Sequence, residues 1–242
     1  MIRREEADFE AEILSESHIA VPFQVTKRND GSLDFLVYSF AVKTAEEFEK
    51  TYGSDPFSAE AKAFLASKLA SVMDEYGFDT DGAADAVHLE YRCDSPAENR
   101  ILPECELICT LEGEEWDELP LDEFDLDPGN PLDRMAVIRE NGRIVCFAGL
   151  NDISEDDGLP EVTVECEEDC RRKGYGASCI AKITAYLLGL GEGVKYVCAE
   201  DNIASAKTAE SAGYVWYAAC MPFVCYRFEK ETDEESDEED PE

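Results

Sequence analysis

The sequence predicts an α+β protein built around a mixed sheet, and three observations in its second half lead to this class. From residue 135 the predicted elements run strand, strand, strand, helix, strand, helix, strand, strand. Asn141-Gly142 joins the first two strands, and this dipeptide is the strongest short signal for a β-hairpin. A basic, glycine-rich turn at residues 171–178 then separates the third strand from the first helix. Hairpins and a strand–helix–strand unit in one stretch indicate antiparallel and parallel neighbours in one sheet.

Residues 1–134 are expected to form an N-terminal α+β extension or domain that carries no chemical motif. The turn sequence Asn29-Asp30-Gly31 joins its first two strands, a capping box from Thr44 to Glu47 opens a short helix, and Asp55-Pro56 opens a longer one. The longer helix has one apolar face and ends at Gly77. The predicted strands of this part cover residues 19–26, 34–42, 86–92 and 104–111, and a Pro- and acid-rich linker covers 112–133.

Residues 135–230 are expected to form the core that carries the chemistry. Its predicted strands cover residues 135–140, 143–150, 161–166, 194–199, 214–221 and 223–228, the last two as a closing pair. Its predicted helices cover residues 176–190 and 204–212. Residues 231–242 include nine acidic groups and no large apolar side chain, so they are predicted to be a disordered tail.

The charge of the chain is far from balanced. Fifty-seven acidic residues stand against 21 Lys and Arg among 242 residues, a formal net charge of -36. A field of this sign repels nucleic acid and anionic lipid headgroups, so neither is expected as a partner. It attracts cationic solutes such as polyamines, aminoglycosides or Lys- and Arg-rich peptides, although a solvated acidic surface is the simpler interpretation.

The ten cysteines are interpreted as free thiols in a reducing cytoplasm. Most lie in apolar, β-rich runs, no C-x-x-C occurs, and the only histidines are His18 and His88. Such spacings fit no zinc site, so no metal is predicted. The N-terminus lacks the apolar stretch of a signal peptide, and no apolar run is long enough to span a bilayer. A cytoplasmic protein is therefore expected.

The turn at residues 171–178 has the physical properties of a diphosphate site. Gly174 and Gly176 allow backbone N–H groups to converge, and the helix that follows adds unpaired N–H groups and a positive dipole end. Arg171, Arg172 and Lys173 stand beside them in a chain otherwise rich in carboxylates. The alternative is that Gly174 merely ends a strand and that the cations balance local acid.

This turn resembles the R/Q-x-x-G-x-G/A pyrophosphate loop of GNAT acetyltransferases, with Arg171, Gly174 and Gly176 at the motif positions. Residues 202–205 and 212–214 resemble the second signature of that family, an Asn after a strand, a short helix, and then Gly-Phe/Tyr entering the next strand. The resemblance spans residues 135–229 and implies a GNAT-like, acyl-CoA-binding N-acyltransferase core after the N-terminal extension. It also allows a homodimer, because dimers are common in the family.

The resemblance implies acetyl-CoA as co-substrate and a role for each motif residue. Backbone groups of residues 164–166 would pair with the pantetheine arm between two splayed strands, and the amides of residues 172–177 would hold the pyrophosphate. Asn202 would approach the thioester, unless it is an ordinary helix N-cap. The implied cofactor-binding residues are Val164, Cys166, Arg171, Arg172, Lys173, Gly174, Tyr175, Gly176, Ala177, Asn202 and Ser205.

Transfer of an acetyl group to an amine needs a base, because an ammonium has no lone pair. Glu161 and Glu165 are the candidate catalytic residues, since strand alternation places both on one face; a water chain could replace either. No covalent intermediate is needed, so Cys166 and Cys170 are not assigned as nucleophiles. The expected function is transfer of acetyl from acetyl-CoA, by direct attack, to a primary amine of a small cationic molecule or of a protein or peptide.

The general acid is missing from the expected place. Many members of the family have a Tyr seven residues after the signature Asn, and Ala209 stands there in this chain. Tyr175, Tyr214 and Tyr217 are near in sequence but not at the motif position. Either another group protonates the departing thiolate, or the thiolate leaves unassisted, or the domain does not catalyse. The last case is the alternative function, a catalytically inactive GNAT-like module that senses acyl-CoA or binds a partner.

Overall fold

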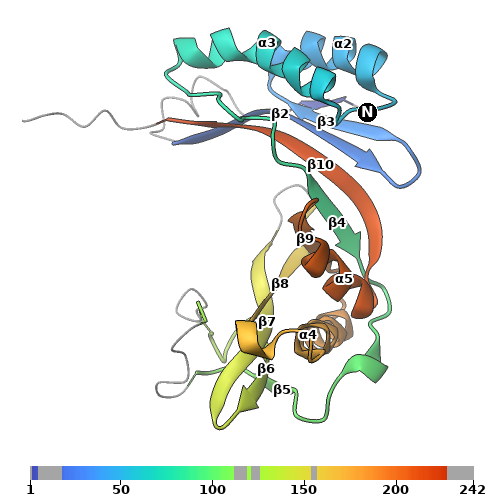
Figure 1. The fold of residues 1–242 in the computed structure, drawn as a ribbon, viewed down its shortest axis with the longest axis vertical. Helices are drawn as coiled ribbons and strands as arrows, with labels where there is room; N and C mark the ends of the chain where they lie inside the picture. The colour runs from blue at the N-terminus through green and yellow to red at the C-terminus, as the bar shows by residue number, and fades with distance from the viewer. Residues whose placement is uncertain (1, 5–17, 112–118, 121–125, 154–156, 228–242) are drawn as a thin grey trace, which may run out of the picture. The chain divides into compact units, whose positions relative to one another are not determined.

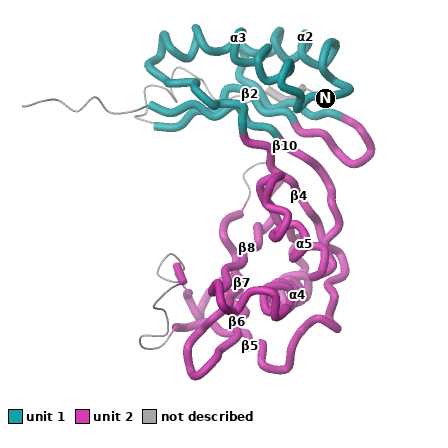
Figure 2. The backbone as a smooth tube through the Cα atoms, viewed as in Figure 1, with its two compact units in different colours: residues 1–25, 33–85, 221–242 teal, residues 26–32, 86–220 magenta. Residues whose placement is uncertain are grey.

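The computed structural model describes residues 2–4, 18–111, 119–120, 126–153 and 157–227 of the chain. The chain divides into two compact units (Figure 2), and each is described by itself. Unit 1 comprises residues 1–25, 33–85 and 221–242, and unit 2 comprises residues 26–32 and 86–220. The predicted acidic tail at 231–242 lies outside the described residues, as does much of the predicted linker at 112–133.

Unit 1 consists of a small sheet and two helices around an aromatic core. Its elements are β1 (Ile2–Arg4), most of β2 (Ile19–Arg28), β3 (Leu33–Val37), α2 (Val42–Tyr52), α3 (Ala59–Glu75) and the end of β10 (Val215–Tyr226). The strands lie in the order β1-β3-β2-β10, with β1 parallel to β3. Phe23, Phe35 and Phe48 are buried with ring centroids 5.5–6.1 Å apart, so strands and helix share one core.

Both helices of unit 1 were predicted, but their starting signals were interpreted wrongly. Thr44 does not cap α2, because a 3-10 turn at Ser39–Ala41 runs directly into the helix and Ala41 precedes it without a side-chain cap. α3 begins after Ser58 rather than at Asp55-Pro56: the Ser58 side chain accepts a hydrogen bond from the Ala61 N–H at 3.3 Å.

Unit 2 contains a mixed sheet, which confirms the predicted α+β class. Its strands are β4 (His88–Arg92), β5 (Glu106–Ile108), β6 (Met135–Glu140), β7 (Arg143–Ile153), β8 (Pro160–Cys166), β9 (Lys195–Ala199) and the first part of β10. The order is β10-β4-β9-β8-β7-β6-β5. β8 and β9 are parallel, and the other neighbours are antiparallel. The hairpin at Asn141-Gly142 joins β6 and β7 as predicted, with Asn141 at φ 54° and Gly142 at φ 85°.

Helices α4 (Tyr175–Leu190) and α5 (Ile203–Ser211) cover the same face of this sheet (Figure 1). α4 packs on β6, β7 and β8, and α5 packs on β9 and α4. The core beneath them includes Val162, Ile180, Ile183 and Tyr196. No helix in the described ranges is both long and apolar enough to cross a membrane.

The closing strand pair predicted at 214–221 and 223–228 is wrong. Residues 215–226 form one continuous strand, β10, in spite of Pro222. The sheet partner of its first part is β4, from the first half of the chain, with Val215 opposite Arg92 and Cys220 opposite His88. Pro222 follows the last residue of β10 that pairs with β4, Cys220. Its missing N–H group therefore does not interrupt the hydrogen bonds between these two strands.

The two units differ from the division expected at residue 134. β4 lies between β9 and β10, and β5 pairs with β6, so residues 86–134 belong to the same unit as residues 135–220. The boundary expected from the sequence lies where the recognisable motifs begin, whereas each unit consists of the segments that pack together, and the division passes through β2 and β10.

Candidate active site

The parallel strands β8 and β9 meet at one position only. In the described residues the register pairs Glu161 with Lys195 and nothing beyond. β8 continues to Cys166, held on its other side by β7 from Ile153 opposite Pro160 to Cys146 opposite Cys166. The carboxyl half of β8 therefore presents an unpaired backbone edge towards β9, and an extended chain can add to such an edge as a strand does. Val164 and Cys166 both lie in this half.

The start of α4 is built to leave backbone N–H groups unbonded. Gly174 precedes the helix at φ 86° and no side chain caps it. Ser178 donates to the Gly174 carbonyl at 3.0 Å, so the N–H groups of Tyr175, Gly176 and Ala177 have no helical acceptor. Arg172 also has positive φ, 64°, which turns the backbone before the helix. Converging amides at the positive end of a helix dipole form an anion-binding site.

The basic side chains of the turn fasten it to neighbouring strands. Arg171 Nε donates to the Cys166 carbonyl at the end of β8, at 3.2 Å. Lys173 Nζ lies 2.7 Å from Glu140 Oε1, and the Tyr175 hydroxyl donates to the same oxygen at 2.7 Å. These two hydrogen bonds hold the pKa of Glu140 below its ordinary value. Sequence reasoning missed Glu140, because only the fold brings the β6–β7 hairpin beside the turn.

Gly176 is a close-approach position. A Cβ atom there would lie 3.2 Å from Thr208 Cγ2 on α5 and 3.6 Å from Val164 Cγ2 on β8. A Cβ at this position would require Thr208 or the start of α4 to shift by a few tenths of an ångström. The glycine thus brings the unbonded amides next to the free edge of β8, the two features that a thioester with a diphosphate tail requires.

Asn202 and Ser205 begin α5. Asn202 Oδ1 accepts a hydrogen bond from the Ser205 N–H at 3.1 Å, so Asn202 is a helix N-cap, which is the second of the two roles predicted for it. Its approach to a thioester stays a prediction. The Ser205 hydroxyl lies 2.7 Å from the hydroxyl of Tyr196 on β9, a contact that sequence reasoning did not foresee.

The two candidate bases differ in their surroundings. Glu161 is half-buried, and burial raises the pKa of its carboxyl group, opposed by the nearby charge of Lys195. Glu165 is exposed and lies opposite Phe147 of β7. A general base that deprotonates an amine works best with a pKa near the working pH. The raised pKa of Glu161 therefore favours Glu161 over Glu165 as the base.

Tyrosines near the motif position are engaged elsewhere. Ala209 is fully buried. The Tyr214 hydroxyl is 2.7 Å from Thr184 Oγ1, Tyr175 binds Glu140, and the Tyr217 hydroxyl accepts from Arg28 at 3.1 Å. The hydroxyl groups of these three tyrosines are thus bound to other side chains of the fold.

All ten cysteines are free. Cys166 lies directly opposite Cys146, and its hydrogen bond to Cys146 together with burial raises its pKa. A thiol held protonated is a poor nucleophile. Within the described parts of the chain, no group of three His, Cys, Asp or Glu side chains could hold a metal ion.

Comparison with known proteins identifies the domain that contains these features. Residues 99–214 match the family model described as "Acetyltransferase (GNAT) family". The chain carries a GNAT-family domain. This GNAT domain spans the free edge of β8, the start of α4 and the Asn202 cap, and it begins before the boundary expected at residue 134. Among curated proteins, none matches the chain.

Solved structures give a distant likeness. A putative GNAT-family acetyltransferase from Novosphingobium aromaticivorans is 20% identical, with a TM-score of 0.44; the alignment covers 59% of this chain and 65% of that one. A GNAT-family acetyltransferase from Colwellia psychrerythraea is 13% identical, with a TM-score of 0.44, covering 81% of this chain and 78% of the other. This chain therefore spans less than two thirds of the first of these relatives.

Proposed function

We propose that the GNAT domain binds acetyl-CoA and transfers its acetyl group to a primary amine by direct attack. The observation that carries the proposal is the juxtaposition at Gly176, which brings three unbonded helix amides beside the free edge of β8. A diphosphate fits the amides, because they supply hydrogen-bond donors and a positive dipole end. An extended pantetheine arm fits the edge, because its amide groups can pair with backbone.

The reaction needs a neutral amine and a path for its protons. Glu161 accepts a proton from the incoming ammonium, and the nitrogen lone pair then attacks the carbonyl carbon of the thioester. A C–N bond forms, the C–S bond breaks, and the electron pair stays on sulfur. The nitrogen loses two protons in total. In the net reaction one of them appears on the thiol of CoA and the other goes to solvent.

A cationic acceptor agrees with the electrostatics. The chain has a net charge of -36, which raises the local concentration of cations. Near Glu161 the carboxylates of Glu90 and Asp157 are already paired with Arg92, at 2.7 and 2.8 Å. Glu161, with Lys195 beside it, and Asp152, opposite it on β7, are the neighbouring carboxylates that Arg92 does not pair with. The acceptor we propose is thus a small cationic amine or a Lys-rich peptide.

The first experiment is calorimetric titration of the whole chain with acetyl-CoA, followed by release of CoA thiol with a panel of amines. The panel comprises spermidine, an aminoglycoside, a Lys-rich peptide and an uncharged primary amine. Binding of acetyl-CoA with turnover of at least one cationic amine is expected. Absence of binding by acetyl-CoA and longer acyl-CoAs would overturn the proposal.

The second candidate function is an acyl-CoA sensor without catalysis. Ala209 favours it, because the residue that many GNAT enzymes place there is a Tyr and this one offers no proton. The same titration separates the two: a sensor binds acetyl-CoA but releases no thiol with any amine of the panel.

A further inference from the structure

The departing thiolate of CoA needs a proton. At the position where many members of the family have a Tyr, this chain has a residue that cannot donate one. Ala209 is buried and apolar, while Tyr175, Tyr214 and Tyr217 each bind another partner. Tyr196 remains. A catalytic role for Tyr196 rests on the proposed function.

Tyr196 stands where β8 and β9 separate. Lys195 is the last residue of β9 that pairs with β8, and Tyr196 follows it directly. Strand alternation puts Lys195 and its partner Glu161 on one face of the sheet and Tyr196 on the other. The base and this phenol therefore flank, from opposite faces, the point at which an extended thioester would enter between the strands.

The hydroxyl of Tyr196 is directed at the start of α5. It lies 2.7 Å from Ser205 Oγ, and either oxygen can be the donor. Ser205 is partly exposed, whereas the Tyr196 side chain is buried. The pair thus connects a buried phenol to solvent through one hydroxyl group, which suits a proton donor that must be recharged after each turnover.

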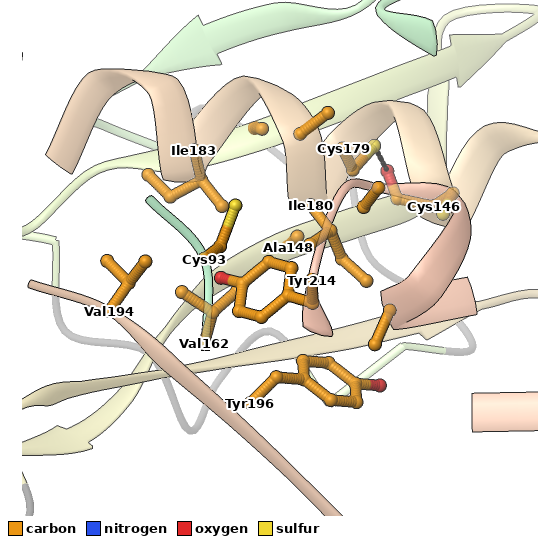
Figure 3. Packing of buried hydrophobic residues seen from close by; sticks show 14 of the residues in the cluster. Cys93, Cys146, Ala148, Val162, Cys179, Ile180, Ile183, Val194, Tyr196 and Tyr214 are labelled. Atoms are coloured by element: carbon orange, nitrogen blue, oxygen red, sulfur yellow. Dashed lines mark hydrogen bonds between the residues drawn. The ribbon is translucent and has the colours of Figure 1, made fainter. Parts of the chain in front are cut away.

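The neighbouring Tyr214 differs from Tyr196 in the surroundings of its hydroxyl group. The two rings contact edge to face with centroids 6.0 Å apart. Figure 3 shows their hydroxyl groups pointing in opposite directions, that of Tyr214 away from Tyr196. The Tyr214 hydroxyl meets Thr184, which is fully buried in α4, so it has no comparable route to solvent.

We propose that Tyr196 is the general acid of this GNAT domain and that Ser205 relays its proton. As the C–S bond breaks, the electron pair on sulfur takes the phenolic proton of Tyr196. The phenolate takes a proton from the Ser205 hydroxyl, and Ser205 takes one from solvent, where the amine protons have gone. The sum is acetyl-CoA and an ammonium giving an amide, CoA thiol and one proton.

The surroundings keep the phenol protonated until it is needed. Burial raises the pKa of Tyr196, and its hydrogen bond with Ser205 opposes this rise. The titratable groups around it are Cys198 on β9, Glu161 and Glu165 on β8, Tyr91 opposite it on β4, and Tyr214 beside it. The two carboxylates raise the pKa further, so the acid form persists at neutral pH.

Tyr196→Phe and Tyr214→Phe form a matched pair of variants. For Tyr196→Phe we expect kcat with the best amine of the panel to fall about 100-fold, the lower end of general-acid contributions, with acetyl-CoA affinity within about threefold of wild type. Tyr214→Phe should keep kcat within about threefold. Retention of kcat by Tyr196→Phe, or equal losses in both variants, would overturn the assignment while leaving acetyl transfer itself intact.

A fluorinated tyrosine at position 196 separates chemistry from structure. Fluorine lowers the phenol pKa from its usual value of about 10 and keeps the shape of the ring. The alkaline limb of the kcat profile should move to lower pH by the shift of the phenol, and fluorotyrosine at position 214 should not move it. An unmoved limb contradicts the role of Tyr196. If the unsubstituted chain turns over no amine, the proposed function fails and this assignment fails with it.

Discussion

The N-termini of helices α3 and α4 differ in whether a side chain binds their unpaired backbone N–H groups. In unit 1, the Ser58 side chain accepts a hydrogen bond from the Ala61 N–H and so satisfies one of the orphan donors of α3. In unit 2, Gly174 precedes α4 with no side chain, and no residue caps the helix. The first terminus has a side-chain cap for one of its donors, and the second has no side-chain cap.

This difference separates stability from binding. A capped terminus contributes to folding and has fewer unpaired N–H groups to offer a ligand. An open terminus contributes less to folding but places its donors where an anion can use them. The contrast therefore predicts that substitutions at the start of α4 lower the affinity for acetyl-CoA, and that substitutions at the start of α3 lower the free energy of unfolding.

Gly174→Asp should give the largest effect. The substitution puts a carboxylate beside the three free amides, and two lost charge-assisted hydrogen bonds cost about 3–6 kcal/mol, or a factor of about 10² to 10⁴ in affinity. Isothermal titration with acetyl-CoA measures it.

Gly191→Asp is the control for that variant. Gly191 ends the same helix with φ 92°, against 86° for Gly174, and neither glycine has an atom within 4 Å of a built Cβ. Both variants carry similar backbone strain, about 1–2 kcal/mol. Equal affinities for acetyl-CoA in the two variants would show that strain, not the anion site, is responsible.

Glu161→Gln should lower kcat/KM by about 100-fold at neutral pH, because a general base is lost. Glu165→Gln is the matched control, on the same face of β8 but exposed, and should change it by less than threefold. Comparable losses in both would point to a general electrostatic effect on the amine.

The pH profile sharpens this prediction. The pKa of Glu161 is raised by burial, so wild-type kcat/KM should fall as pH drops through a value above the ordinary 4.5. A raised folded pKa also means that Glu161 costs stability once pH rises above it, so Glu161→Gln should resist urea better at pH 7 than wild type. Lys195→Met removes the opposing cation and should move the acid limb to higher pH.

The features of the fold and the site that depend on neighbouring residues could be predicted from the sequence, and those that depend on contacts between distant segments could not. The turn at 171–178, the Asn141-Gly142 hairpin and the strand from 161 to 166 depend on neighbouring residues, and all appear in the structure. Glu140 beside Lys173, Ser205 beside Tyr196 and β4 beside β10 depend on pairings between distant segments. No local pattern encodes such pairings, which is why the sequence predicted neither the division into these two units nor these contacts.

Arg171→Ala should reduce acetyl-CoA affinity by about tenfold, and Lys173→Ala by about threefold. The Lys173 ammonium is already paired with Glu140 at 2.7 Å. Within the described ranges, the Arg171 partner is a backbone carbonyl, bound through Nε, so the Arg171 charge acts more fully on a diphosphate. Titration at low and high salt checks it, because the Arg171 contribution should shrink with ionic strength. The reverse order of the two variants would indicate that Glu140 does not neutralise Lys173.

Ser58→Ala should leave acetyl-CoA affinity unchanged, which is the smallest functional effect and the strictest test of the contrast between the two helix starts. Loss of an N-cap costs about 1 kcal/mol, so the urea midpoint should fall. Ser67→Ala, also in α3, is the control: its exposed hydroxyl donates to the Phe64 carbonyl within the helix, and alanine has the higher helix propensity, so stability should hold or rise. If Ser58→Ala weakens acetyl-CoA binding as well as folding, the two units are energetically coupled, and the start of α3 cannot be treated as a purely structural counterpart of the start of α4.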